Sequence, residues 1–211
     1  RIAQLCLHAG NAAAKASAFA KACFYLQFGV SMLDDDCWTR NYDMALALHN
    51  ATAETEFCLR NSEKMNTIID GVLKHGRSLS HKMHAYRTRI HDLGVRNQTQ
   101  QSIQLGLSVL SQLGETIYAS GIRGKLMLVA ELRRVQRELR GKSNEQLLRM
   151  PSMTSGDKLQ ALHVLHLLFM DSLIGNPSLF PFVVLRAMRI TLRYGLSPLS
   201  PSVFCLYGML C

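Results

Sequence analysis

The stretch from Asp34 to His75 constrains the fold most, because it carries two helical apolar patterns separated by a polar turn. The first pattern predicts a helix from about Tyr42 to Leu59, with Asn50 as a polar interruption of its apolar stripe. That stripe consists of Leu46, Ala47, Ala53, Phe57 and Cys58. After the turn Arg60–Ser62, where we expect Ser62 to cap, a second helix closes before Gly76. Its apolar face consists of Met65, Ile68, Ile69, Val72 and Leu73.

Such a pair cannot bury its apolar faces alone, so the sequence predicts similar pairs on both sides. The pattern of a short polar turn followed by a helix does recur. Aligning its three copies places Ala22, Met65 and Ser102 at equivalent positions, which are 43 and 37 residues apart. Repeats near this size include the tetratricopeptide type, at about 34 residues, and the longer armadillo and HEAT types. We therefore predict an all-α fold, a right-handed superhelix of antiparallel helix pairs, which is a tetratricopeptide-like α-solenoid.

The predicted organisation has two parts. Residues 1–114 hold the helix pairs, and residues 115–211 continue the helical array after the repeat signal fades. The other expected helices are Ile2–Ala14 with Leu5, Cys6 and Ala13 facing inward, one from Ser17, Ser80–Val95, Gln98–Leu113, Lys125–Arg140, Asn144–Arg149, Asp157–Leu173, Ser178–Tyr194 and one from Ser200. The last segment ends inside an apolar run, so we expect a piece of a longer polypeptide.

Composition indicates the compartment more than the activity. The six cysteines include no Cys-x-x-Cys pair and most lie in apolar surroundings, which favours buried thiols in a reducing, cytoplasmic location. The longest apolar runs are interrupted by charges and are too short to span a bilayer, so we expect no membrane contact. The net charge of +9 is explained by charges spread over a solvated exterior, and it gives no information about the fold.

No complete catalytic motif is present. The stretch Gly121–Leu126 lacks the spacing and the hydroxyl of a phosphate loop. Two histidine pairs, His81 with His84 and His163 with His166, have helical spacing, but no third ligand is evident. We therefore expect no enzyme activity, no cofactor and no metal site, although a pocket built from these histidines is the competing enzyme hypothesis.

The amino-acid sequence of the repeats is more informative than the repeat length. Three runs follow one another in order along nearly the whole chain: AGNAAAKASAFAKACFYLQFGVSMLDDDCW, YDMALALHNATAETEFCLRN and NPSLFPFVVLRAMRITLRYGLSPLSPSVFCLYGMLC. They resemble the helical region of large multidomain signalling ATPases, in which a serine/threonine kinase-like domain and an AAA-type ATPase precede helical repeats. A GAF domain and often a histidine kinase follow. The resemblance implies a sensor or transmission arm, with the ATP and kinase sites outside these residues.

The function expected is therefore that of a non-catalytic helical-repeat segment, which transmits signals or docks proteins within a larger ATP-dependent kinase-type polypeptide. The partner would be a protein or peptide, including adjacent domains of the same polypeptide. One alternative is a stand-alone tetratricopeptide-like adaptor, and a second is nucleic-acid binding by the basic helix 125–140, which its lack of aromatics disfavours. The expected partner-binding residues line the first helix of each pair: His49, Asn50, Glu54, His84, Arg87, Arg89 and His91.

Overall fold

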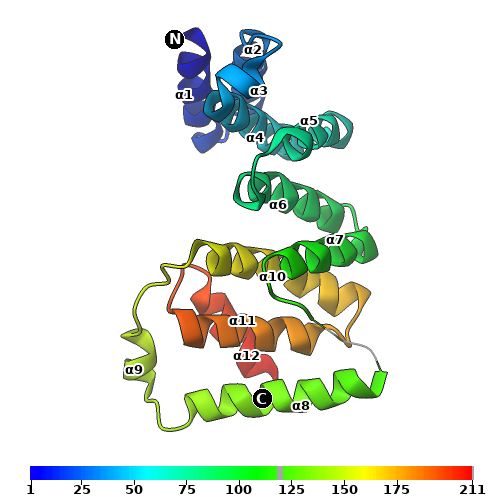
Figure 1. The fold of residues 1–211 in the computed structure, drawn as a ribbon, viewed down its shortest axis with the longest axis vertical. Helices are drawn as coiled ribbons and strands as arrows, with labels where there is room; N and C mark the ends of the chain where they lie inside the picture. The colour runs from blue at the N-terminus through cyan, green and yellow to red at the C-terminus, as the bar shows by residue number, and fades with distance from the viewer. Residues whose placement is uncertain (118–120, 211) are drawn as a thin grey trace. The chain divides into compact units, whose positions relative to one another are not determined.

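A computed structural model describes residues 1–117 and 121–210, with side chains described for all of these except 121–123 and 125. Within these ranges the chain is all-helical, and no β-strand occurs among them (Figure 1). The predicted all-α class is confirmed. The helices are α1 (Ile2–Lys15), α2 (Phe19–Ser31), α3 (Cys37–Arg40), α4 (Tyr42–Cys58), α5 (Ser62–His75), α6 (Leu79–Val95), α7 (Thr99–Gln112), α8 (Gly121–Leu139), α9 (Asn144–Leu148), α10 (Gly156–Gly175), α11 (Phe180–Tyr194) and α12 (Ser200–Leu210).

The chain divides into two compact units, Arg1–Asp92 and Leu93–Cys211. The division falls inside α6, whereas the repeat pattern in the sequence runs on to Gly114 before it fades. The boundary after Asp92 separates two groups of residues that contact one another, whereas the boundary at Gly114 marks where the repeated turn is no longer found in the sequence. Each unit is described by itself below.

One turn geometry recurs inside three helix pairs. Ser17, Arg60 and Asn97 have φ angles of 57°, 61° and 60°, and α2, α5 and α7 each begin two residues later. The residue after each turn donates its backbone N–H to a carbonyl five positions back, at 2.8–2.9 Å. These donations run from Ala18 to Ala13, from Asn61 to Glu56 and from Gln98 to Leu93. This is the Schellman closure of a helix.

Burial follows the same register in the second helix of each pair. Five residues after the turn lie Ala22, Met65 and Ser102, and all three are fully buried. The alignment read from the sequence is therefore also an alignment of structural environments. The positions nine and twelve residues after the turn are buried as well: Leu26, Ile69 and Gly106, then Gly29, Val72 and Val109.

The first unit is built by successive packing of α1 on α2, α2 on α4 and α4 on α5. Close helix approach requires two glycines here. A Cβ at Gly10 would lie 2.5 Å from Leu26, and one at Gly29 would lie 2.9 Å from both Cys6 and Leu48. The core between α4, α5 and α6 consists of Ala53, Met65, Ile69, Val72 and Ala85.

Three local expectations in this unit were wrong, and one short helix was not foreseen. Leu5 is 68% exposed, because the face of α1 that meets α2 is the one carrying Cys6 and Gly10. Cys58 is exposed as well. Ser62 makes no capping bond; its hydroxyl donates to Asp92 on α6 instead, at 2.6 Å. The short helix α3 was not predicted, and its Trp38 packs on the core described above.

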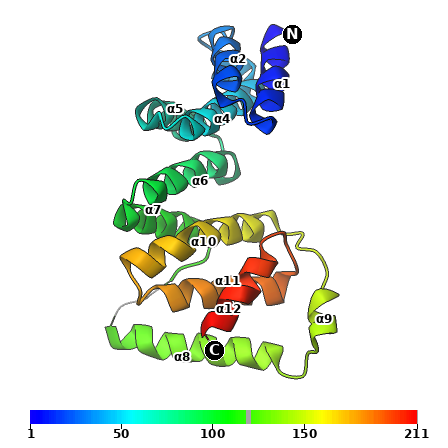
Figure 2. The ribbon, with the colours of Figure 1, turned by 180° about the vertical axis from the view of Figure 1, so that it is seen from behind.

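The second unit is organised around α10 and α11. Helix α10 packs on α7 and on α11, and α11 also packs on α8 and α12 (Figure 2). Gly195, with a φ of 108°, ends α11, and the Leu196 N–H then donates to Pro151 at 2.8 Å. Ser143 and Gln146 form the capping box of α9.

Buried ion pairs join the helices of this unit. Glu115, just after α7, accepts from Lys158 on α10 at 2.6 Å and from Arg186 on α11 at 2.7 Å. Glu131 on α8 accepts from Arg189 on α11 at 2.8 Å. Residues far apart in the sequence thus neutralise one another inside the helical packing.

Candidate functional site

Helices α4 and α6 of the first unit run side by side in the same direction. The Tyr42 hydroxyl near the start of α4 lies 2.8 Å from His81 Nδ1 near the start of α6. Near the end of both helices, the rings of Phe57 and His91 lie 4.7 Å apart. This parallel arrangement places several expected partner-binding residues together, and we call the set Asn50, Glu54, His84, Arg87 and His91 the α4–α6 face.

An acid–base pair occupies the middle of this face. His84 Nε2 lies 3.3 Å from Glu54 Oε2, which is close enough for an ion pair but lacks hydrogen-bond alignment. His84 and the nearby Arg87 guanidinium lower the pKa of Glu54 below its ordinary value. The Glu54 side chain is 61% exposed, so this charge is available to a partner.

Three polar atoms on the α4–α6 face are buried without a hydrogen-bond partner among the described residues: Asn50 Oδ1, His84 Nε2 and Arg87 Nε. Burial also lowers the pKa of Arg87 below its ordinary value. Leaving a buried polar atom unpaired costs about 1–3 kcal/mol. These atoms are closed off from solvent, so the exposed Glu54 carboxylate is the group of the face that a partner can reach.

A pocket adjoins the face where α1 meets α4. Its volume is about 390 Å³, and Glu54 and Cys58 of α4 contribute to its wall. Helix α1 contributes Asn11 and Lys15, which sequence reasoning missed because only the packing of α1 on α4 brings them beside Glu54. Glu54 belongs to both the pocket and the α4–α6 face. The full lining is Asn11, Ala14, Lys15, Phe19, Ala51, Glu54, Thr55 and Cys58.

Two expected partner-binding residues lie elsewhere. The His49 ring lies 4.8 Å from that of Trp38, its Nδ1–H donates to the Ala45 carbonyl at 2.7 Å, and burial lowers its pKa. Arg89 points to α5, where it donates to Asn66 at 3.0 Å and to Asp70 at 2.7 Å. Helical spacing alone does not distinguish a side chain that crosses to the neighbouring helix from one that faces solvent.

A buried carboxylate lies at the end of α4. Glu56 is fully buried and accepts from Cys23 at 3.3 Å, from Gln27 at 2.6 Å and from Asn61 at 2.8 Å. Burial and the bond to Glu56 raise the pKa of Cys23 to about 11, which makes this thiol a poor nucleophile. The cluster holds α2, α4 and the turn together and is structural.

The histidine pairs do not converge on a ligand set. His81 contacts Tyr42, and His166 lies 3.3 Å from the Ser202 hydroxyl, with its pKa lowered by burial. Among residues 1–117 and 121–210, no group of three or more His, Cys, Asp or Glu side chains is placed to hold a metal ion. Residues 121–126 begin α8, and most of their side chains lie outside the described set.

The basic helix α8 presents a separate charged surface. Arg133, Arg137 and Arg140 line a hollow of about 560 Å³ together with Gln136. Of its two acidic residues, Glu131 faces inward to Arg189 and Glu138 is half-buried, whereas Arg133, Arg134 and Arg137 are exposed.

The chain matches no protein-family model, and searches among curated proteins and solved structures found no match either. In the part of the chain that is described, no helix has the length and apolarity needed to cross a bilayer.

Proposed function

We propose that the chain is a non-catalytic helical-repeat segment that docks a protein or peptide on the α4–α6 face and the adjoining α1–α4 pocket. The partner would be a separate protein or an adjacent domain of the same polypeptide. In this proposal the helix pairs form a right-handed, tetratricopeptide-like superhelix whose first helices line the concave side. Support comes from the recurring turn, the shared burial register and the parallel course of α4 and α6.

The observation that carries the proposal is the 61% exposed carboxylate of Glu54, which belongs both to the α4–α6 face and to the α1–α4 pocket. A peptide backbone presents N–H donors that this carboxylate can accept. Lys15 on the α1 wall of the pocket adds a positive charge. Mixed charge of this kind suits a protein surface better than a uniformly charged polymer.

The resemblance of the repeats to signalling ATPases suggests where such a segment works. We propose that it is the sensor or transmission arm of an ATP-dependent, kinase-type polypeptide in the cytoplasm, and that catalysis belongs to other domains. A stand-alone adaptor is the alternative, and it differs only in whether the docked partner is part of the same polypeptide.

The test is selection of peptides of about ten residues from a random display library on the immobilised chain, followed by titration calorimetry. Arg87→Gln should weaken binding of the selected peptides by about tenfold or more, as expected for a lost bond to a charged group. Arg89→Gln is the matched control, because it removes an arginine of the same helix that bonds to α5. Equal effects of the two variants, or selection of no peptide, would count against this face.

Nucleic-acid binding by α8 is a second candidate, favoured only by the arginine-lined hollow. It predicts affinity for a single-stranded oligonucleotide that falls steeply with salt concentration. Replacing Arg133 and Arg137 together by Gln should abolish that affinity. No binding at low ionic strength would eliminate this candidate.

A further inference from the structure

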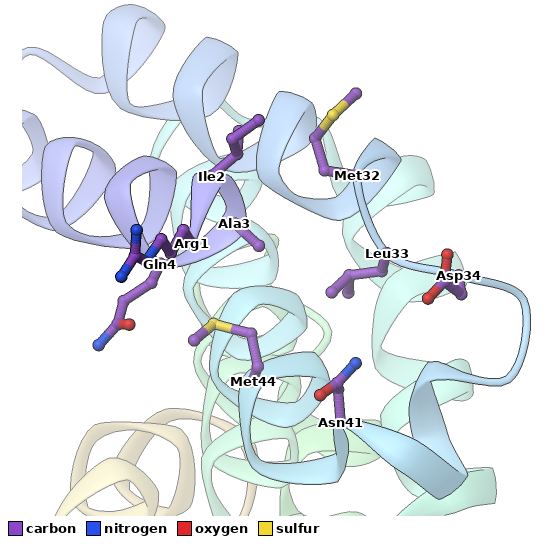
Figure 3. A pocket seen from close by; sticks show the side chains of 9 residues that line it. All are labelled: Arg1, Ile2, Ala3, Gln4, Met32, Leu33, Asp34, Asn41 and Met44. Carbon is purple, nitrogen blue, oxygen red and sulfur yellow. The ribbon is translucent and has the colours of Figure 1, made fainter.

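The longest run of consecutive exposed residues in the described part of the chain is 140–146, at the corner between α8 and α9. Figure 1 and Figure 2 both show α9 at the edge of the second unit, and none of its residues is buried. The hollow lined by Ile2, Leu33 and Met44 in the first unit is the opposite case, because three segments of the chain wall it in (Figure 3). The corner can open at low cost, since few apolar contacts are lost when it does. An enzyme that binds several consecutive residues therefore has access to it.

Ser143 is the hydroxyl residue of this exposed corner. Its hydroxyl accepts from the Gln146 N–H at 3.3 Å and donates to no described group. Three exposed cationic side chains precede it, at six, three and one positions: Arg137, Arg140 and Lys142. Protein kinases distinguish substrates by charge patterns of this kind, in which carboxylates of the enzyme pair with basic residues of the substrate. The pattern and the exposure together indicate a phosphate acceptor.

Arginine stands three residues before a hydroxyl residue at four places in the chain, which allows an internal comparison. The four hydroxyl residues are Ser80, Thr99, Ser143 and Ser152. Ser80 lies inside α6, and the arginine before it is already engaged. The Arg77 guanidinium lies 3.9 Å from the centroid of the Tyr42 ring and donates to the Trp38 carbonyl at 3.3 Å. A kinase that binds this arginine would have to break both contacts.

Thr99 and Ser152 are held by tertiary contacts. Thr99 is half-buried at the start of α7 and packs against Gly175 of α10, so closely that a Cβ would not fit there. Ser152 is exposed, but the backbone groups on both sides of it bond to Leu196, at 2.7 and 2.8 Å. The backbone bonds of Ser143, in contrast, are local to its own turn and helix. Of the four, it alone combines an exposed hydroxyl residue and an exposed arginine with a segment that can open.

We propose that Ser143 is a phosphorylation site for a kinase that recognises arginine three residues before its acceptor. The γ-phosphoryl group of ATP passes to the Ser143 Oγ, and the new P–O bond forms as the bond to the β-phosphate breaks. ADP leaves, and the hydroxyl proton passes to the catalytic carboxylate of the kinase. This modification is independent of docking on the α4–α6 face, which belongs to the first unit.

The phosphate would lie beside two cations of the same turn. Gly141, with a φ of 82°, reverses the chain after α8, and the Lys142 N–H donates to the Leu139 carbonyl at 3.0 Å. A phosphoserine carries a charge of about −1.5 to −2 at pH 7, so we expect it to pair with Arg140 and Lys142. Because Arg140 also lines the hollow on α8, phosphorylation lowers the positive charge of that surface.

The test is incubation of the full 211-residue chain with Mg²⁺, ATP and a serine/threonine kinase that selects arginine three residues before its acceptor. Peptide mass spectrometry should find phosphate on Ser143 at an initial rate at least about tenfold above that on the other three positions, where folded contacts must first break. Short synthetic peptides around Ser80 and Ser152 should accept phosphate faster than the same serines in the folded chain. No phosphate on Ser143, or equal rates at all four positions, overturns the proposal.

A pair of variants tests which arginine directs the kinase. Arg140→Gln should lower the rate at Ser143 by about tenfold or more, as expected for a lost bond between two charged groups. Arg133→Gln is the matched control, because it removes another exposed arginine of α8, about two turns earlier, and should leave the rate unchanged. Both side chains are exposed, so both variants should fold. Equal rates in the two variants overturn the proposed recognition.

Phosphorus-31 NMR titration of the phosphorylated chain tests the pairing within the turn. The second pKa of a phosphoserine is ordinarily about 6, and the two neighbouring cations should lower it because they favour the dianion. Lys142→Gln keeps the arginine that the kinase recognises and should raise this pKa toward its ordinary value. An unshifted pKa in the wild-type chain shows that the phosphate does not pair with Arg140 and Lys142, and it overturns that part of the proposal.

Discussion

Replacing Glu115 by Gln should destabilise the second unit substantially. The Glu115 side chain is 6% exposed, and its two partners Lys158 and Arg186 are 19% and 11% exposed, at 2.6 and 2.7 Å. Removing one member of a buried ion pair costs about 3–5 kcal/mol, because the remaining charge has no compensation. Arg186 keeps a second carboxylate, Glu131, at 3.7 Å, so we expect the lower end, about 3 kcal/mol.

The assay is urea unfolding of wild type and variant followed by far-ultraviolet circular dichroism, with linear extrapolation to water. Asp36→Asn is the matched control, since Asp36 pairs with Arg40 at 2.6 Å but the two side chains are 46% and 74% exposed. An exposed pair contributes about 0–1 kcal/mol. If Glu115→Gln costs no more than the control, the ion pairs of Glu115 do not stabilise the fold as argued.

The pH dependence provides an independent check on the same residue. Burial alone would raise the pKa of Glu115, but Lys158 and Arg186 hold it below its ordinary value of 4.5. A carboxylate whose folded pKa is depressed contributes stability above the unfolded pKa, and that stability is lost as the pH falls through the folded pKa. The difference between wild type and Glu115→Gln should therefore be largest above pH 4.5 and shrink below it. A difference that grows on acidification would refute the assignment.

Three further predictions concern other contacts. Glu56→Ala should lower the free energy of unfolding by about 2 kcal/mol, since it removes the acceptor of three side-chain donors; fluorescence of Trp38, the only tryptophan, reports this transition. Gly195→Ala should cost about 1–3 kcal/mol in thermal unfolding, because its φ is 108° and a Cβ would meet backbone atoms; an unchanged melting temperature would contradict this. Cys23 should react with iodoacetamide at pH 8 far more slowly than exposed Cys58, and equal rates by mass spectrometry would contradict its raised pKa.

The sequence by itself determined the helices and their register. Helical periodicity and turn sequences are local properties of the chain. For this reason the pair α4 and α5 was predicted within a residue of its observed ends. The alignment of Ala22, Met65 and Ser102 was likewise correct, because the same left-handed turn precedes each by five residues. The candidate face was predicted in part, since α4 and α6 bring Glu54 and His84 together.

Only the tertiary structure decided which polar residues point inward and to what. Glu56 resembles any solvated glutamate in a helix, yet it is fully buried because Cys23 and Gln27 reach it from α2. Arg89 and Arg87 lie two residues apart on the same helix, yet the Arg89 side chain extends to α5, where it forms an ion pair with Asp70. Partners such as these lie 19–33 positions apart, and the pairing depends on how helices stack and not on spacing along one helix. Long-range electrostatics and hydrogen bonding are thus properties of the packed chain, whereas periodicity belongs to each segment alone.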